Sequence, residues 1–481
     1  MASFAKKDAI TMLITLMLQF QKITDFNGLK KYFELSPISF CDISAGAKYM
    51  WRNVYVCEYA FYDDTLIIKE SSEEYKDVFY YPMGKNPAGA VKAIEEYCVA
   101  TNTPLTFGCI DNVYAAKLAH EYGDVEIISE RDWNDYIYEA QSFKTYAGKK
   151  YGGQRNHVNK FRKTHPDYTF NVLKEEDLPE IKRFLSEYEN GADISSHSAA
   201  EEEDNVYDAT EKSFVLGQVA GYIRTGGKIV AFSLGEVVGD TLIVHIEKAL
   251  RAYAGAYPTV ASEFAKAFAG AGVKYINREE DCGDMGLRVS KMQYHPTEIK
   301  QKNTVYVHTS ADKLKLPLKI ATERLVIEET AAADDEDYYR LYSDDKLNEF
   351  WGYDYREDLG EKKADKKYFA EFRQGLREKK EEYSFMVKKD GKVVGEIVLY
   401  GFGYRGEAEI GFRFYESEQG KGYATESVGA FADYMLTTCG YKKIKAKAFI
   451  QNEKSLKLIR KLGFKKTGED EKFFYFEKMP A

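Results

Sequence analysis

Paired cysteine motifs are missing from this 481-residue chain. Its six cysteines form no CxxC pair; they stand at 41, 57, 98, 109, 282 and 439. The spacing gives no metal-ligand pattern, and a chain of this size needs no disulfides to hold a core. We therefore expect no metal, free thiols and a reducing cytoplasm.

Long hydrophobic runs are also lacking. The apolar run from Ala9 to Leu18 follows Lys6 and Lys7, as in a short signal peptide, but it is too short to span a bilayer. No small-residue cleavage site follows, because the next residues read Gln-Phe-Gln-Lys. We expect residues 1–16 to be a leader or a first helix, and the protein to be cytoplasmic without a membrane partner.

An excess of positive charge is lacking too. With 68 Lys and Arg against 77 Asp and Glu, the net charge is −9, which disfavours general binding to nucleic acid or to an anionic membrane. One segment departs from this balance, since residues 144–163 hold seven Lys or Arg and no acid. Such a segment either binds the phosphates of a ligand such as a tRNA acceptor end, or is the solvated face of a helix.

The length and an internal repeat indicate several folding units. At about 100–200 residues per domain, the chain holds roughly three units. Three short segments recur in order, about 164 to 168 residues apart: Gly227-Lys-Ile-Val as Gly391-Lys-Val-Val, Ala254-Gly-Ala-Tyr as Gly420-Lys-Gly-Tyr, and Gly272-Val-Lys-Tyr-Ile as Gly440-Tyr-Lys-Lys-Ile. We place the units at 17–170, 171–308 and 320–481, with a linker at 309–319.

The C-terminal unit shows helix and strand signals in a clear order. We expect strands at 324–327, 384–389, 392–400, 408–415 and 444–450, and helical segments at 334–380, from the glycine-rich segment to about 438, and at 452–463. In the middle helix, Val428, Phe431, Ala432, Met435 and Leu436 recur at helical spacing. The last helix ends at Gly463.

A glycine-rich turn, Gln419-Gly-Lys-Gly-Tyr-Ala424, stands between a predicted strand and a predicted helix. A sharp turn there leaves backbone N–H groups pointing outward, beside the partial positive charge of the helix start. Glycine allows an anion to approach the backbone closely. The turn is therefore either an anion cradle suited to a pyrophosphate or a plain tight connection.

The context of this turn favours the first interpretation. The pattern Gln/Arg-x-x-Gly-x-Gly/Ala of the acetyl-CoA loop is matched by Gln419, Gly422 and Ala424. Residues 408–414 resemble the fourth strand of the GNAT superfamily, and residues 452–464 resemble its last strand-to-helix crossing. The C-terminal unit thus resembles GNAT acetyltransferases, most closely the branch of ribosomal-protein alanine acetyltransferases. The resemblance implies transfer of an acetyl group from acetyl-CoA to an amine by direct attack, without a covalent enzyme intermediate.

The resemblance also implies site residues. Backbone amides of Gly420, Lys421, Gly422, Tyr423 and Ala424, together with Gln419, are expected to hold the pyrophosphate. The strand containing Ile410 and Phe412 is expected to pair with the pantetheine arm through free backbone groups. Asn452 and Ser455 resemble residues that contact the cofactor arm, and Asn452 is equally well explained as a helix N-cap.

A general base must take a proton from the attacking amine. Glu409 lies on the strand beside the expected thioester and is our first candidate, acting through a water; Glu396 and Glu407 are alternatives. Each is otherwise an ordinary strand carboxylate. Many family members use a Tyr of the last helix as the acid, but this stretch reads Leu458-Ile-Arg-Lys, so the acid stays unassigned.

The N-terminal two-thirds shows other motifs: Trp51-Arg52, residues 146–151 with 154–161, residues 245–249, and residues 277–281 with 286–288. From about residue 17 to 308 the chain resembles an uncharacterised family allied to the C-terminal catalytic domain of bacterial phosphatidylglycerol lysyltransferases, which has two GNAT-like halves. Those enzymes carry a membrane domain that we do not find in this sequence, which leaves a lipid substrate in doubt.

Candidate residues of this N-terminal module are charged or polar side chains in those motifs: Lys149, Lys150, Arg155, Asn156, Lys160, His245, Glu247, Lys248, Asp281 and Arg288. His245 and Glu247 face the same side of one predicted strand, as a general-base pair or as a structural hydrogen bond. Asp281 and Arg288 are either functional or a buried ion pair. At the second unit's phosphate loop, Ala254 and Pro258 depart from the glycine pattern, which indicates weak or absent CoA binding there.

Together these observations predict an α/β (α+β) protein of three GNAT-like units, each a mixed, mostly antiparallel twisted sheet flanked by helices. We expect the third unit to transfer acetyl groups from acetyl-CoA to a primary amine, either a small molecule or a protein N-terminus. The first two units then bind substrate or perform a second acyl or aminoacyl transfer. The alternatives are a tRNA-dependent aminoacyltransferase with an accessory GNAT domain, and a non-catalytic N-terminal scaffold. The oligomeric state does not follow from the sequence.

Overall fold

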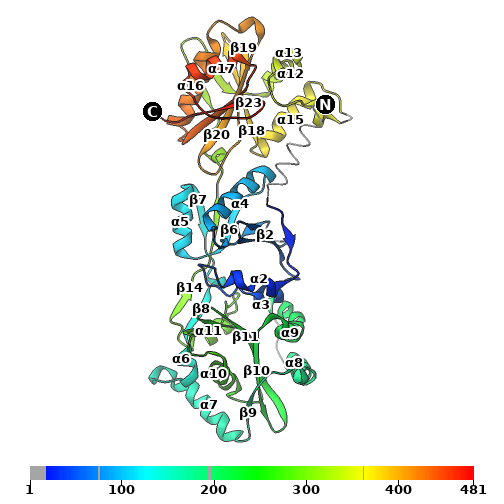
Figure 1. The fold of residues 1–481 in the computed structure, drawn as a ribbon, viewed down its shortest axis with the longest axis vertical. Helices are drawn as coiled ribbons and strands as arrows, with labels where there is room; N and C mark the ends of the chain where they lie inside the picture. The colour runs from blue at the N-terminus through cyan, green and yellow to red at the C-terminus, as the bar shows by residue number, and fades with distance from the viewer. Residues whose placement is uncertain (1–17, 74–75, 192–196, 361, 481) are drawn as a thin grey trace. The chain divides into compact units, whose positions relative to one another are not determined.

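The chain forms two compact units in the computed structural model, which describes residues 18–73, 76–191, 197–360 and 362–480 (Figure 1). One unit comprises residues 1–118 and 126–306, and the other comprises residues 119–125 and 307–481. The predicted leader or first helix at 1–16 lies outside the described residues.

The N-terminal part of the chain builds an eight-stranded sheet in the order β1-β2-β3-β4-β6-β15-β7, with β5 paired to β3. Its strands are β1 (Gln21–Lys22), β2 (Val56–Tyr62), β3 (Thr65–Ser71), β4 (Val78–Phe79), β5 (Met83–Gly84), β6 (Leu105–Ile110), β7 (Val125–Ile128) and β15 (Asn303–Val307). The helices of this region are α2 (Phe26–Phe33), α3 (Ala45–Met50), α4 (Pro87–Thr101) and α5 (Asn112–Tyr122).

A seven-stranded second sheet follows, in the order β14-β8-β13-β12-β11-β10-β9. Its strands are β8 (Asp135–Glu139), β9 (Thr169–Val172), β10 (Val219–Thr225), β11 (Lys228–Val238), β12 (Thr241–Ala249), β13 (Tyr275–Asn277) and β14 (Glu298–Lys300). The accompanying helices are α6 (Ala140–Thr145), α7 (Gly152–Thr164), α8 (Leu178–Gly191), α9 (His197–Leu216), α10 (Ala256–Phe268) and α11 (Met285–Met292), with short 3-10 turns at Arg131–Trp133, Lys149–Tyr151 and Glu175–Asp177.

Membership of these two sheets divides the chain differently from the predicted boundary at residue 170. Strand β8 already belongs to the second sheet, where it pairs antiparallel with β13 and β14, and β15 returns to the first sheet. Pairing between strands that are more than 100 residues apart leaves no local pattern in the sequence, so the boundary could not be read from it.

The C-terminal unit has an eight-stranded sheet in the order β16-β17-β18-β19-β20-β21-β23-β22. Its strands are β16 (Lys319–Ala321), β17 (Val326–Glu329), β18 (Glu382–Lys389), β19 (Lys392–Tyr400), β20 (Glu407–Phe414), β21 (Lys443–Phe449), β22 (Lys465–Glu469) and β23 (Phe473–Lys478). Its helices are α12 (Asp335–Ser343), α13 (Asp345–Asn348), α14 (Arg356–Leu359), α15 (Lys366–Glu378), α16 (Tyr423–Thr437) and α17 (Glu453–Lys461), with 3-10 turns at Ser310–Lys313, Ala332–Asp334 and Glu416–Glu418.

The elements expected in this unit are present within a few residues of their predicted ends. The final hairpin β22–β23 was not expected. Its strands are short and half-exposed, and apolar and polar residues alternate only weakly along them. Within the predicted linker 309–319, Ala311 and Leu318 are buried in the core of this unit, and β16 begins at Lys319.

Two apolar layers cover the C-terminal sheet. The predicted apolar face of α16 is buried against one side, where Val428, Phe431 and Met435 pack on the strands. On the other side α12 and α15 enclose Met386 with Tyr338 and Phe369. This arrangement confirms the predicted fold class: three mixed, mostly antiparallel sheets flanked by helices, as in GNAT-like units.

The predicted repeat corresponds to a shared order of elements. In the second sheet a hairpin (β10–β11) leads to β12, α10 and β13, and β13 pairs parallel with β12. In the C-terminal sheet a hairpin (β18–β19) leads to β20, α16 and β21, and β21 pairs parallel with β20. No described helix of the chain is long and apolar enough to cross a bilayer.

Candidate functional site

The glycine-rich segment forms the turn that leads into α16. Gly420 and Gly422 have φ values of 76° and 85°, a left-handed backbone that suits glycine. Gly422 is also the N-cap of α16, so the turn ends at the positive end of that helix. A Cβ added at Gly422 would lie 3.2 Å from Arg324 Nη2, whereas one at Gly420 would meet nothing within 4 Å.

The backbone of this turn offers hydrogen-bond donors. Among the residues that the structure describes, no group accepts a hydrogen bond from the N–H groups of residues 420–424. The side chains of Tyr423 and Ala424 pack toward the core, so their backbone N–H groups are what the turn presents. Donors at a helix start without internal partners fit an anionic group such as a pyrophosphate.

Polar side chains fix the turn. Gln419 Nε2 donates to the carbonyl of Phe414 at 3.1 Å, which ties the turn to the end of β20. Lys421 Nζ lies 2.9 Å from Glu418, and Arg324 Nε lies 2.7 Å from Glu426. The turn therefore has cations close by, each already paired with one carboxylate.

Strands β20 and β21 diverge beside this turn. Their parallel pairing covers only three residues of β20, and the last pair is Glu409 with Lys445. Beyond Glu409, β20 still pairs with β19 on its other side through Phe414. Ile410 is buried in the core and Phe412 packs against it, so these residues present backbone groups, rather than side chains, to the gap left by β21.

Glu409 lies at the point of divergence. Tyr400, opposite it on β19, donates a short hydrogen bond from its hydroxyl to Glu409 Oε1, and Lys447 Nζ lies 3.4 Å from the same oxygen. Burial and the neighbouring Glu409 carboxylate raise the pKa of Tyr400 well above its usual value. Tyr400 therefore keeps its proton and can hold Glu409 in place while the carboxylate exchanges a proton with a neighbour.

The alternative bases Glu396 and Glu407 have structural partners. Glu396 is fully buried, accepts from Ser384 Oγ at 2.5 Å, and receives Arg413 Nη2 at 2.6 Å. Both of its oxygens are thus occupied inside a buried ion pair. Glu407 accepts from the backbone N–H of Arg405 at 3.1 Å and lies 3.4 Å from Lys445 Nζ. These surroundings suit structural roles better than that of a general base.

Glu382 is a titratable group that the sequence reasoning missed. It lies opposite Tyr400 on the neighbouring strand β18, and Tyr342 Oη donates to it at 3.3 Å. Burial, then the nearby Glu396 charge, raise the pKa of Glu382 to about 7. The row Glu382, Tyr400 and Glu409 crosses three strands, so no spacing along the sequence could have shown it.

Asn452 and Ser455 form a helix cap. Asn452 Oδ1 accepts a hydrogen bond from the backbone N–H of Ser455 at 3.1 Å and is the N-cap of α17. The cap explains the presence of Asn452 without a cofactor. Contact of either residue with a cofactor arm stays a prediction.

In the N-terminal unit, His245 lies between two carboxylates. Its Nδ1 is 2.7 Å from Glu279 and its Nε2 is 2.9 Å from Glu236, with the ring almost fully buried. Burial opposes the charge, but the two carboxylates outweigh it and raise the pKa of His245 to about 10. A histidine that stays protonated cannot serve as a base near neutral pH.

His245 and Glu247 were expected to face the same side of a strand, and they have different partners. The pairing of β11 with β12 shifts between Leu234 and Gly235, which leaves His245 without an opposite residue. Such a bulge re-aims the side chain. Glu247 instead meets Arg278 at 2.7 Å, and burial raises the pKa of Glu247. The ammonium of Lys248 lies over the ring of Tyr188, 5.1 Å from its centroid.

Asp281 is buried and forms an ion pair with the half-buried Arg288. Arg288 Nη2 lies 2.7 Å from Asp281 Oδ1, and Asp281 also accepts from Tyr136 Oη at 2.6 Å and lies 3.1 Å from Arg131 Nη1. Burial opposes ionisation of this carboxyl, but hydrogen bonds from Arg288 and Tyr136 hold its pKa at about 2. Of the two predicted roles, the geometry favours the structural one.

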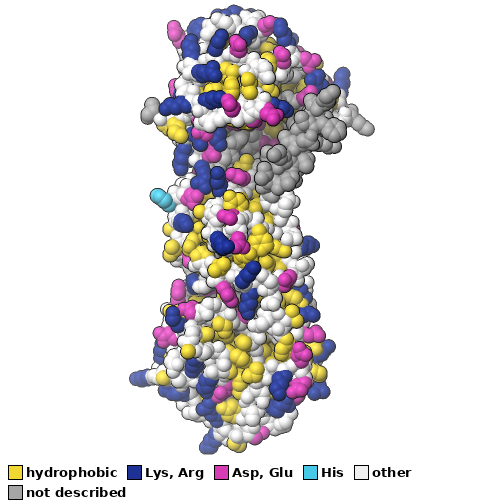
Figure 2. All heavy atoms as spheres, in the orientation of Figure 1, with side chains coloured by type: hydrophobic (Ala, Val, Ile, Leu, Met, Phe, Trp, Pro, Cys, Tyr) yellow, Lys and Arg dark blue, Asp and Glu magenta, His cyan; other side chains and the backbone are white. Residues whose placement is uncertain are grey.

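The basic segment 144–163 lies on the surface along the 3-10 turn Lys149–Tyr151 and α7. Lys149, Lys150, Asn156 and Lys160 are exposed, and the described residues provide no carboxylate partner for these three lysines. Arg155 donates to the carbonyls of Tyr146 and Gly148. Figure 2 shows Lys and Arg side chains on the visible face of the part that carries α7. These cations remain available to a phosphorylated ligand.

The counterpart of the glycine-rich turn in the second sheet is covered. Gly255, with φ of 92°, is the N-cap of α10, as Gly422 is of α16. A Cβ at Gly255 would collide with the backbone carbonyl of His157 and lie 3.2 Å from the Cβ of Phe161, both on α7. Helix α7 therefore packs directly on the turn where a pyrophosphate would have to lie.

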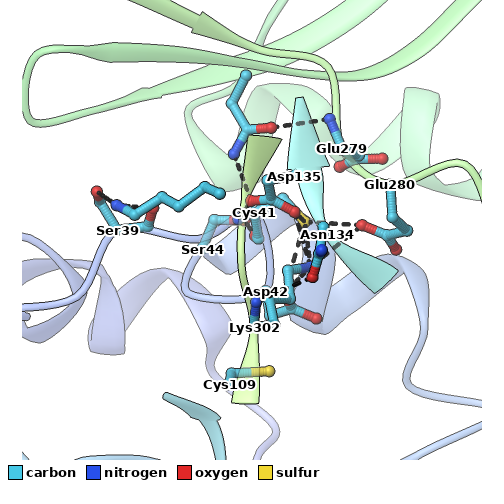
Figure 3. A network of polar contacts seen from close by, with 12 residues as sticks. Ser39, Cys41, Asp42, Ser44, Cys109, Asn134, Asp135, Glu279, Glu280 and Lys302 are labelled. Carbon is cyan, nitrogen blue, oxygen red and sulfur yellow. Dashed lines mark hydrogen bonds and ion pairs between the residues drawn. The ribbon is translucent and has the colours of Figure 1, made fainter. Parts of the chain in front are cut away.

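A second buried network surrounds Lys302 (Figure 3). Its ammonium lies 2.6 Å from Asp42, 2.7 Å from Asp135, 3.2 Å from Glu280 and 3.3 Å from Cys41 Sγ. Cys41, Asp42 and Asp135 could by their spacing hold a metal ion, but the Lys302 ammonium lies among them and supplies the positive charge. Burial, then Asp135, raise the pKa of Cys41 well above its usual value, so the thiol stays protonated.

Comparison with known families agrees with this geometry. A model of the family "Phosphatidylglycerol lysyltransferase, C-terminal" matches residues 34–306, more than half of the chain. The chain belongs to this family. A model of the acetyltransferase (GNAT) domain matches residues 324–465, so the predicted fusion of the two families is confirmed.

Individual relatives match parts of the chain. The uncharacterized N-acetyltransferase YoaA of Bacillus subtilis is 25% identical over 158 residues, 32% of this chain and 88% of that protein. The uncharacterized N-acetyltransferase p20 of Bacillus licheniformis is 36% identical over 90 residues, 18% of this chain, and the match spans about half of p20, 49%. A conserved protein of unknown function from Bacteroides thetaiotaomicron has a crystal structure that aligns with 60% of this chain and 99% of its own, with 29% identity and a TM-score of 0.56.

Proposed function

We propose that the C-terminal unit is an N-acetyltransferase that uses acetyl-CoA and a primary amine. The observation that carries this proposal is the divergence of β20 and β21 after Glu409, beside a turn whose backbone N–H groups have no described acceptor. The match to the GNAT family supports acyl transfer in general, and the named N-acetyltransferase relatives support an amine acceptor.

The chain fits the cofactor at both ends of this site. The backbone of residues 420–424 and the positive end of α16 would hold the pyrophosphate, and free backbone groups of β20 at Ile410 and Phe412 would pair with the pantetheine arm. When bound, acetyl-CoA supplies an activated acetyl group that an amine attacks directly. Cations near the turn, among them Arg324 and Lys421, favour the phosphates.

Glu409 is the group best placed to take the proton of the incoming ammonium. It lies at the divergence, is held by Tyr400, and is neighboured by Lys447. A proton reaches Glu409 directly or through a water and leaves toward solvent. Tyr400 keeps its own proton because its pKa is well above the usual range, so it positions Glu409 rather than replacing it.

The test is calorimetric titration of the full chain with acetyl-CoA. We expect about one bound molecule per chain, and Gly422→Glu should abolish binding, because a longer side chain and a negative charge would occupy the anion site. The matched control is Gly440→Glu, which has a similar φ of 73° and open surroundings at the other end of α16. Equal affinity in wild type and Gly422→Glu would show that the turn is a plain connection.

Turnover against a panel of amines then tests the base. Glu409→Gln should lower kcat by about 10²-fold or more, the usual contribution of general base catalysis, and leave acetyl-CoA affinity unchanged. Glu407→Gln serves as the neighbouring control on the same strand. Full activity of Glu409→Gln would remove Glu409 from the reaction.

For the N-terminal unit the family name favours a second candidate, transfer of an acyl or aminoacyl group. The observation in its favour is the set of lysines without a described carboxylate partner on the 3-10 turn Lys149–Tyr151 and on α7, which suits phosphates of CoA or of a tRNA acceptor end. The competing proposal is a binding scaffold without catalysis, favoured by the ion pairs that fill the gap between β12 and β13. A cytoplasmic location remains our proposal for the whole chain.

A further inference from the structure

The surface of β20 just past Glu409 is covered by an aromatic ring. Gly411 follows Glu409 on the same face of the strand. A Cβ built on Gly411 would lie 3.5 Å from Trp351 Cη2, 3.6 Å from Tyr400 Cε1 and 2.9 Å from Val398 Cγ2. Because glycine has no side chain, the tip of the indole approaches the strand backbone directly, at the position where β20 has already separated from β21.

The indole of Trp351 is held in a fixed position. The guanidinium of Arg413 lies 4.2 Å from the Trp351 ring centroid and 3.8 Å from that of Tyr342, between the two rings. Arg413 is itself fixed by Glu396 at 2.6 Å and by Asn348 Oδ1 at 2.5 Å, and the backbone N–H of Trp351 donates to the Asn348 carbonyl at 3.0 Å. The segment after α13 is thereby tied to β20, and swinging the indole away would break its contact with the Arg413 guanidinium.

We propose that Trp351, resting on Gly411, sets the length of the acyl group that this unit accepts and restricts it to acetyl. This inference rests on the proposed function, because the acyl group must reach the divergence beside Glu409. The indole and the Tyr400 ring close the face of the strand next to that point, so carbons beyond the acetyl methyl would meet a rigid wall. One methylene too many in a tight apolar site lowers affinity by roughly 10- to 200-fold.

The experiment measures affinities of acetyl-CoA, propanoyl-CoA and butanoyl-CoA for the full chain by calorimetry. Wild type should bind butanoyl-CoA at least about tenfold more weakly than acetyl-CoA. Trp351→Ala should remove most of that preference, because it opens space for two or more methylenes. The matched control is Phe350→Ala, the preceding aromatic residue, which packs on Phe449 with ring centroids 5.7 Å apart and should keep the wild-type preference.

A second variant guards against a folding defect. Trp351→Leu keeps an apolar residue in contact with the strand and should give an intermediate preference, with a circular dichroism spectrum like that of wild type. Equal preference for acetyl-CoA in wild type and in both Trp351 variants would overturn the assignment of Trp351 alone. Failure of the wild type to bind any of the three thioesters would overturn the proposed function, and this inference with it.

Discussion

The second sheet and the C-terminal sheet share a parallel strand pair that separates, and they use the gap in opposite ways. In the C-terminal unit β20 continues past Glu409 with Gly411, and no backbone packs on Gly420 or Gly422 of the adjoining turn. In the N-terminal unit β12 continues past Ile243 with His245 and Glu247, which pair with Glu279 and Arg278. The turn before α10 is covered by α7.

This difference shows that topology alone does not make a cofactor site. Both units provide a helix start beside diverging strands, the arrangement that suits a phosphate and an extended arm. In one unit, charged side chains and a packed helix occupy that space. In the other, no described group accepts hydrogen bonds from the N–H groups of the turn. We therefore expect acetyl-CoA to bind once per chain, at the C-terminal turn.

The largest effect is expected where the N-terminal gap is filled. If Glu247 and Arg278 are structural, then Arg278→Met leaves a buried carboxylate without its cation and should lower the free energy of unfolding by roughly 3–5 kcal/mol. Changing both residues, in Glu247→Leu with Arg278→Met, should recover most of that loss. Thermal unfolding followed by circular dichroism measures both.

The control for that pair is Arg162→Met. Arg162 is far more exposed than Arg278, and its partner Glu263, 3.0 Å away, also pairs with Lys266, so the loss should stay below about 1 kcal/mol. If Arg278→Met lowers the free energy of unfolding as little as this control does, the Glu247–Arg278 pair does not stabilise the fold. The gap in the second sheet would then again be a candidate functional site.

A smaller effect concerns the C-terminal unit, where the half-buried Glu382 forms no ion pair among the described residues. The folded state raises the pKa of Glu382 from 4.5 to about 7 and so holds a proton that the unfolded chain releases. The contribution of Glu382 to the free energy of unfolding is therefore fully present below pH 4.5 and is lost as the pH rises through about 7. The free energy of unfolding of Glu382→Gln should be higher than that of wild type by roughly 1–3 kcal/mol at pH 8, and the two should differ little at pH 5.

Unfolding in urea at several pH values measures this difference. Glu378→Gln, on the exposed end of α15, is the matched control and should follow wild type at every pH. A Glu382→Gln curve parallel to that of wild type would mean that the carboxyl is solvated in the folded protein, and the two units would then differ less in how they bury charge.

The smallest effect is expected on the basic surface. Changing Lys149, Lys150, Arg155 and Lys160 to Ala should weaken binding of a phosphorylated ligand by about tenfold and flatten its salt dependence, because fewer counterions are released. The ligands to compare are CoA and a tRNA acceptor stem, at several salt concentrations. Unchanged affinity for both would leave the segment as a solvated helix face.

Much of the fold followed from local patterns. The glycine-rich turn, the apolar face of α16 and the strands around it are encoded by residues close together in the chain, so they were predictable. The repeat predicted a shared order of elements in the second and third sheets, and the structure has it. The final hairpin β22–β23 was not predicted, because neither strand has a strong alternation of apolar and polar residues.

The candidate site was predictable only in part. Sequence motifs placed Glu409 and the turn at 420–424, but they could not show that Tyr400 holds Glu409 or that Glu396 is occupied by Arg413. They also could not show that a bulge separates His245 from Glu247. Each of these contacts joins different strands, and the register between strands is set by tertiary packing.

By itself the sequence determined most helices and strands of the C-terminal unit, where the backbone can turn sharply, and which two families the chain joins. The tertiary structure alone decided which of two similar strand gaps stays open. That choice depends on long-range neighbours: α7 lies on Gly255, and Arg278 reaches Glu247, whereas Gly422 meets only the flexible end of Arg324. Burial and charge pairing act between residues far apart in the chain, and they become defined only when the chain is folded.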